Sequence, residues 1–141
     1  MKKLLLLLVA LLLVFSCVPE DDNRVQFHIE FVPAVSVELP ESFTRGQTYE
    51  IKVKYNRPTD CHYFDGFYYE ATGNVRVVAV QTIVIEDANC EPLVSLAPEE
   101  SSFNFFCSPS YSDNSYKFKF YTGQGSNGSQ EFMVVEVPVV Q

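Results

Sequence analysis

Hydrophobic and polar residues alternate along most of the chain after residue 24, with the period of two that predicts β-strands. The clearest case is the segment 49–55, in which aromatic or aliphatic residues alternate strictly with charged ones. Similar alternation occupies residues 25–31 and 35–39, and residues 61–70, 75–85, 101–107, 116–121 and 131–140 are further predicted strands. No segment of this part shows the 3.6-residue stripe of an amphipathic helix. The pattern therefore predicts a domain made of strands.

Turn-forming residues separate these segments. Ala71-Thr72-Gly73-Asn74 predicts a hairpin between 61–70 and 75–85. The second arm of that hairpin is long and rich in β-branched residues, which predicts a bulge or a change of sheet within it. Pro33 predicts a broken edge strand, because proline cannot donate to a central ladder.

Seven or eight strands at regular spacing are typical of an immunoglobulin-like β-sandwich of antiparallel strands, which we predict for residues 25–141. A small closed barrel is the alternative. The chain has no tryptophan, so the hallmark of antibody domains, a Trp beside two sheet-bridging cysteines, is absent. We therefore predict a member of the wider class of immunoglobulin-like sandwiches and not an antibody-type domain.

The first 16 residues predict a signal peptide. Lys2 and Lys3 precede twelve apolar residues, 4–15, and a small residue, Ser16. Twelve residues at about 1.5 Å each reach only ~18 Å as a helix, well short of a hydrocarbon core of roughly 30 Å. A membrane-spanning helix is therefore not expected here.

Val14-Phe15-Ser16-Cys17 resembles the lipobox of bacterial lipoproteins. That resemblance implies cleavage before Cys17, which would carry the lipid, and attachment to the outer membrane. A soluble secreted protein is the alternative. Residues 17–24 are expected to form a lipidated acidic tether, and their acidic residues resemble the surface-export signal of Bacteroidetes lipoproteins. Display at the cell surface is thus the hypothesis, and a plain hydrophilic spacer is its alternative.

The resemblance extends along most of the remaining chain. Residues 116–123, the segment from Cys61 to Tyr69 and the closing Val137-Pro138-Val139 look like those of small uncharacterised lipoproteins of flavobacterial type. This resemblance implies a fold and an envelope location, and it implies no known activity.

Composition narrows the classes of partner. The formal net charge of −8 would become −10 after loss of Lys2 and Lys3. So acidic a surface argues against nucleic acid and against direct adhesion to anionic lipid. The expected partners are the membrane, through the anchor, and a protein or glycan, and we expect no cofactor.

Three cysteines follow the anchor, and an oxidising envelope favours one disulfide among them. Cys61 and Cys90 both lie beside turn-forming residues, whereas Cys107 continues an apolar face. We predict the pair Cys61–Cys90 with Cys107 free and buried. The pair Cys90–Cys107 is the alternative.

Reactive residue types do not add up to a catalytic or metal site in this sequence. Cys61 and His62 are neighbours in a predicted strand, so their side chains point to opposite faces. The carboxylates that the hairpin could bring together belong to Asp65, Glu70, Glu86 and Asp87. They lack the short regular spacing of a calcium loop, and solvated strand charges explain them. The sequence therefore predicts a protein that is not an enzyme, with no metal ligands.

Aromatic residues crowd the segment 63–69, where both faces of one strand carry them. One face must enter the core, and the other then meets solvent or another element. Phe64, Tyr68 and Tyr69 are the candidate surface for a protein or glycan partner; cross-strand packing is the alternative. We therefore expect a lipid-anchored binding or structural protein. A role as an accessory subunit of an envelope assembly is one form of this hypothesis, and a carbohydrate-binding module is the alternative.

Overall fold

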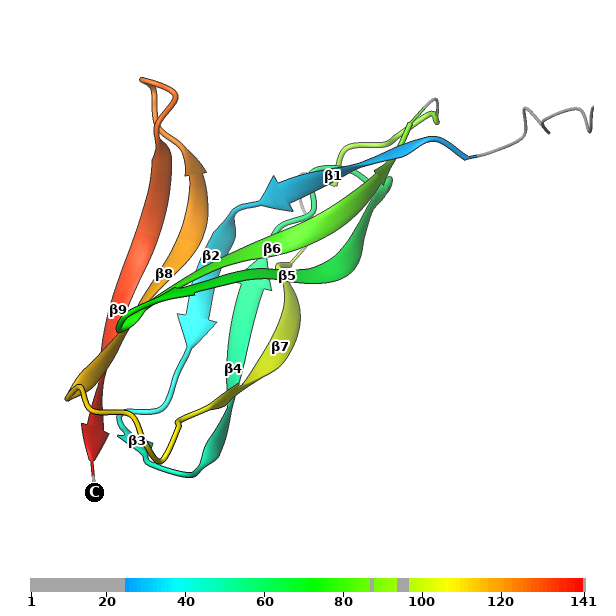
Figure 1. Ribbon diagram of the computed structural model, residues 1–141. Helices are drawn as coiled ribbons and strands as arrows, with labels where there is room; N and C mark the ends of the chain where they lie inside the picture. Colours follow the sequence, from blue (N-terminus) through cyan, green and yellow to red (C-terminus); the bar gives the residue numbers. More distant parts are fainter. Residues whose placement is uncertain (1–24, 87, 94–96, 141) are drawn as a thin grey trace, which may run out of the picture.

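The computed structural model describes residues 25–86, 88–93 and 97–140, which form nine strands and no helix (Figure 1). The strands are β1 (Phe27–Val32), β2 (Ala34–Glu38), β3 (Phe43–Thr44), β4 (Thr48–Tyr55), β5 (His62–Thr72), β6 (Val75–Ile85), β7 (Glu99–Phe106), β8 (Ser115–Gln124) and β9 (Gln130–Val140). They build one sheet of six strands and one of three. The predicted all-β sandwich class is confirmed. Nothing in the described residues is a helix long and apolar enough to cross a membrane.

Strand β6 organises the six-stranded sheet. One of its edges pairs with β5 in the predicted hairpin. Its other edge pairs first with β8, through residues 75–78, and then with β1, through residues 80–85. Strand β6 thus stays in one sheet and unbroken, and the bulge expected within it lies instead on β5, between Phe64 and Gly66.

Pro33 marks the point where the chain changes sheet. Strand β1 belongs to the six-stranded sheet, whereas β2 forms an edge of the three-stranded sheet, whose order is β2-β4-β7 (Figure 1). The predicted interruption is confirmed. Proline has no N–H to donate to a neighbouring strand, and none is needed where the chain leaves one sheet for the other.

Two pairs of strands are parallel, β6 with β8 and β3 with β9, which the prediction of antiparallel strands alone did not include. Strand β7 lies in the other sheet, so the chain crosses over before it enters β8. A crossover connection allows parallel pairing, whereas a tight hairpin does not. Strand β3, of only two residues, was also not predicted.

The core lies between the two sheets and is rich in aromatic rings. Phe43 of β3 is fully buried, and its ring lies 4.8 Å from that of Phe105 and 5.9 Å from that of Phe118, centroid to centroid. Burial of this one large side chain explains why so short a strand is held in place. The other fully buried large side chains of the described residues are Tyr55, Tyr116, Phe118, Phe120, Ile51, Val32, Val53, Val78, Val80, Thr82 and Cys107.

Candidate binding groove and the predicted site residues

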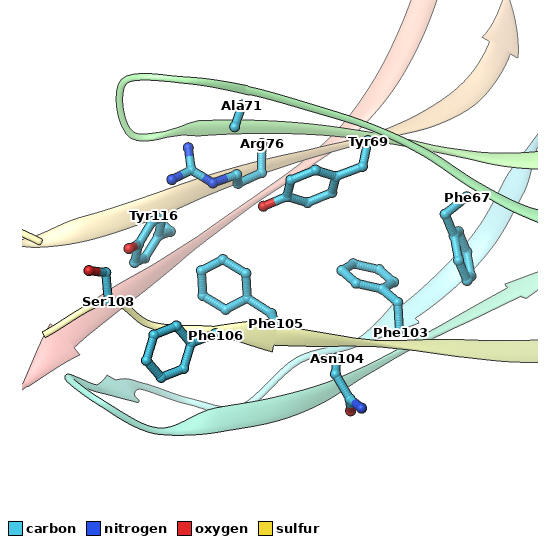
Figure 2. A pocket seen from close by; sticks show the side chains of 10 residues that line it. All are labelled: Phe67, Tyr69, Ala71, Arg76, Phe103, Asn104, Phe105, Phe106, Ser108 and Tyr116. Carbon is cyan, nitrogen blue, oxygen red and sulfur yellow. The ribbon is translucent and has the colours of Figure 1, made fainter.

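A groove opens where the edges of the two sheets face each other, between β5 and β7. In the described part of the chain, β5 pairs only with β6, and β7 pairs only with β4. The groove has a volume of about 530 Å³ (Figure 2). Its lining residues are Phe67, Tyr69, Ala71, Arg76, Phe103, Asn104, Phe105, Phe106, Ser108 and Tyr116.

Aromatic rings from the two facing strands form the walls. Figure 2 shows Phe67 and Tyr69 reaching from the β5–β6 hairpin toward Phe103 and Phe105 of β7. The rings of Phe67 and Phe103 lie 5.1 Å apart, and those of Tyr69 and Phe103 lie 6.2 Å apart. These residues point inward because alternate residues of a strand share a face. Since no further strand from residues 25–86, 88–93 or 97–140 covers them, the groove is open in this part of the chain.

Arg76 supplies the charge of the groove. It is the one charged residue among the lining residues, and it lies over the ring of Tyr116, 4.8 Å from the ring centroid. Its Nη1 donates hydrogen bonds of 2.8 Å to the carbonyl oxygens of Gly73 and Val75. Burial raises the pKa of Tyr69, and the nearby Arg76 cation opposes that rise. An acidic chain thus presents a positive charge at this groove.

The three candidate residues of the aromatic segment lie on two different faces. Strict alternation would place Phe64 with Tyr68, but the bulge on β5 shifts Phe64 to the inner face, where Tyr69 also lies. Phe64 stacks on Tyr55 at 5.9 Å, and Tyr69 lines the groove. Tyr68 lies on the outer face, where its ring is 5.5 Å from Phe31.

The outer face of β1, β5 and β6 carries exposed apolar side chains. Phe27, Ile29 and Phe31 alternate along β1, and their exposed fractions are 57%, 47% and 37%. Tyr63 pairs in register with Ile83, which in turn pairs with Ile29, so Tyr63 extends the same face. The apolar row recognised in the sequence therefore faces outward, and the opposite row, His28 and Glu30, lies on the inner face.

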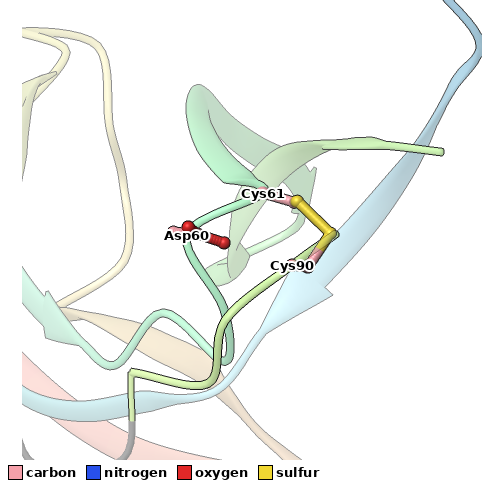
Figure 3. Close-up of side chains that lie close together, drawn as sticks. All are labelled: Asp60, Cys61 and Cys90. Carbon is pink, nitrogen blue, oxygen red and sulfur yellow. A yellow bond between two sulfur atoms is a disulfide. The ribbon is translucent and has the colours of Figure 1, made fainter. Parts of the chain in front are cut away.

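The predicted disulfide between Cys61 and Cys90 is confirmed, with Cα atoms 5.5 Å apart (Figure 3). Cys107 is free and fully buried, as expected. Burial raises the pKa of its thiol, which opposes formation of a reactive thiolate.

Asp60 lies beside the two bridged sulfur atoms. It accepts a hydrogen bond from the backbone N–H of Glu91. A disulfide offers no thiolate, so this group is not a metal site in the oxidised protein.

The carboxylates considered for calcium or acid–base work are held by separate partners. Asp65 accepts from Gln81 Nε2 at 2.7 Å, Glu70 accepts from the Tyr68 hydroxyl at 2.8 Å, and Glu86 pairs with His28. Asp87 lies outside the described residues, as do the signal peptide 1–16, Cys17 and the tether 17–24.

Comparisons of the chain with known protein families, with curated proteins and with solved structures found no match. The class that the fold and site define is a two-sheet β-sandwich with an aromatic groove at its open edge. A function has to be argued from that groove and from the sequence.

Proposed function

We propose that this protein is a non-catalytic, lipid-anchored binding protein of the bacterial outer membrane that holds an extended polypeptide segment of an envelope partner. One observation carries the proposal: two strand edges, those of β5 and β7, have no pairing partner among the described residues and border an aromatic-lined groove. An extended segment hydrogen-bonds to such an edge and places alternate side chains into the groove.

The groove also defines the chemistry of the segment. Its walls are aromatic, so the inward side chains of the partner are apolar. Arg76 is the charge that the partner meets, and an acidic side chain or a terminal carboxylate complements it. The partner is therefore an extended segment that combines alternate apolar residues with one carboxylate.

The place of the groove suits attachment at Cys17. Strand β1 begins opposite Ile85, at the far end of β6, whereas the groove residues Ala71 and Arg76 flank the turn that opens β6. A tether that enters at β1 thus holds the groove at the end of the hairpin away from the membrane. Outward display rests on the resemblance of the acidic tether to an export signal. An immunoglobulin-like arrangement of the strands is the accompanying fold proposal.

A carbohydrate-binding module is the second candidate function. Tyr69 is 44% exposed in the groove wall, and aromatic rings of this kind stack on the apolar faces of sugars. Arg76, Asn104 and Ser108 are among the hydrogen-bonding groups that a sugar would meet. In this version the ligand is a glycan and the unpaired strand edges have no role.

Photo-crosslinking in the cell envelope tests the first candidate. A photoreactive residue replaces Phe106 at the rim of the groove, and the matched control replaces Val134, which is similarly exposed on β9. We expect a discrete adduct with one envelope protein from position 106, absent from position 134 and abolished by Arg76→Glu. Equal adducts from both positions overturn the proposal. Glycan-array binding that Tyr69→Ala abolishes, with no protein adduct, supports the second candidate instead.

The anchor has its own test. Metabolic labelling with a palmitate analogue should mark the wild type and Ser16→Ala, because small residues are equivalent before the cleavage site, and it should not mark Cys17→Ser. Protease added to intact cells should then degrade the wild-type protein if it faces outward. Absence of the label from the wild type, or its presence on Cys17→Ser, contradicts the lipid anchor, and full protection from protease contradicts surface display.

A further inference from the structure

Strand β1 carries its apolar side chains on the outside of the protein. Phe27, Ile29 and Phe31 lie exposed on the outer face of the six-stranded sheet, whereas His28 and Glu30 lie on its inner face. A strand of a sandwich normally has the opposite orientation, with its apolar row toward the core and its polar row toward water. The described residues leave the apolar row of β1 exposed, so a contact with something else is the natural explanation of this inversion.

The apolar row continues onto the strands beside β1. Ile83 of β6 is in register with Ile29 of β1 on one side and with Tyr63 of β5 on the other. Residues in register share a face of the sheet. The surface that results, here called the β1 face, consists of Phe27, Ile29, Phe31, Tyr63, Ile83 and Ile85, all at least partly exposed and none of them charged. A contiguous apolar surface of this kind marks a contact with a protein or with a membrane.

The position of the β1 face along the chain favours a membrane. In the proposed lipoprotein, the eight residues 17–24 join the lipid on Cys17 to Val25, which comes directly before β1. Eight residues span at most about 28 Å even when fully extended, so Val25 stays within that distance of the lipid attachment. Strand β1 is the first strand that the tether reaches. The apolar face therefore lies on the strand that the anchor keeps closest to the bilayer.

Apolar burial, and not charge, drives a contact of this kind. Asp65 and Arg57 border the β1 face, and each already has a partner. Asp65 accepts a hydrogen bond from Gln81 Nε2, and Arg57 pairs with Glu99. The chain as a whole is acidic, so anionic headgroups do not attract it. Aromatic and aliphatic side chains favour the interface of a bilayer even without charge attraction, so a neutral lipid surface matches the β1 face.

We propose that the β1 face rests on the surface of the bilayer that holds the lipid of Cys17. The inference rests on the proposed lipid anchor, and it adds which face of the domain meets the membrane. The tether keeps the β1 face at a high local concentration beside the bilayer, so a contact too weak to bind a free protein is sufficient here. The groove residues Ala71 and Arg76 lie at the other end of β6, away from this contact.

Tryptophan fluorescence tests the contact, because the chain has no tryptophan of its own. Lipidated Phe27→Trp protein is purified in mild detergent and reconstituted into vesicles of phosphatidylcholine and phosphatidylethanolamine, with brominated lipid as the quencher. The matched control is Phe106→Trp on the other sheet, where the native ring is 55% exposed, against 57% for Phe27. We expect brominated lipid to quench Phe27→Trp at least about twofold more than Phe106→Trp. The emission maximum of Phe27→Trp should also shift to shorter wavelength on reconstitution.

A second substitution in the Phe27→Trp protein tests the β1 face itself. Ile29→Lys places a charge in its middle and should abolish the quenching, whereas Val134→Lys on β9, at a similarly exposed position, should leave it unchanged. Circular dichroism checks that both keep the fold. Equal quenching of Phe27→Trp and Phe106→Trp in lipidated protein overturns this inference alone, and absence of the palmitate label from the wild type overturns the anchor with it. A wavelength shift without quenching assigns the face to a protein partner and also overturns the inference.

Discussion

Arg76 lies over the ring of Tyr116, with its guanidinium carbon 4.8 Å from the ring centroid, at the open edge between the two sheets. The same guanidinium holds two carbonyl oxygens of the β5–β6 turn. The residue that gives the groove its charge thus also ties the hairpin to β8. The proposed binding chemistry and the stability of the hairpin therefore depend on the same side chain.

Replacement of the Arg76 side chain should lower the stability of the fold measurably. Arg76→Met should lower the free energy of unfolding by about 1–2 kcal/mol, because a cation over a largely buried ring is worth about 0.5–2 kcal/mol. Urea unfolding of the wild type and the variant measures this difference in free energy. The control is Lys119→Met, which removes a cation 4.9 Å from the more exposed ring of Phe132 and should cost less than about 1 kcal/mol. Equal losses in the two variants would contradict the assignment.

Loss of the disulfide should destabilise the domain strongly. Cys61 and Cys90 are 29 residues apart in sequence, and closing a loop of that length is worth about 3–4 kcal/mol in the chain-entropy treatment. We expect the double variant Cys61→Ala/Cys90→Ala to lose that much in urea unfolding. The wild type under reductant should match it. A loss below about 1 kcal/mol would show that the unfolded chain gains little freedom.

Phe43 should be among the costliest residues to truncate, although its strand has two residues. Phe43→Ala should lower the free energy of unfolding by about 3–5 kcal/mol, because a fully buried ring leaves a cavity. Chemical denaturation gives the value. Phe106→Ala, in which a ring that is 55% exposed is removed, should change stability by no more than about 0.5 kcal/mol. A similar cost for both variants would refute the central place of Phe43 in the core.

Stability should fall in alkaline solution as Tyr111 ionises. Burial, reinforced by Asp113 and Tyr116, raises the pKa of Tyr111 from 10.0 to about 12. Its hydroxyl donates a 2.6 Å hydrogen bond to the carbonyl of Ser115, which the phenolate cannot make. The unfolded chain therefore releases this proton first. The contribution of Tyr111 to the free energy of unfolding is therefore fully present below pH 10.0 and is lost as the pH rises toward about 12.

Urea midpoints measured across that window test the effect. Tyr111→Phe should show a smaller decline than the wild type. Part of the decline should remain, because burial also raises the pKa of Tyr55 and Tyr116. Parallel curves for the two proteins would show that Tyr111 does not contribute.

Sequence alone was enough for the features that depend on neighbouring residues. The alternation at 49–55 fixed both a strand and its buried face, since Ile51, Val53 and Tyr55 are all buried as that pattern requires. The hairpin turn at Gly73, the interruption at Pro33 and the pairing of Cys61 with Cys90 were predicted in the same way. Each follows from side-chain period, turn chemistry or position relative to a turn.

Only the tertiary structure decided which strands become neighbours. The bulge at Gly66 moved Phe64 to the face of Tyr69, because one extra residue in a strand reverses the alternation that follows it. The groove joins β5 to β7, and His28 and His62 lie on opposite sides of β6, both in register with Val84. A local pattern states that a strand forms and which residues share its face. It carries no signal for the partner across the sheet, because that choice is made by crossovers and by packing between residues far apart in the chain.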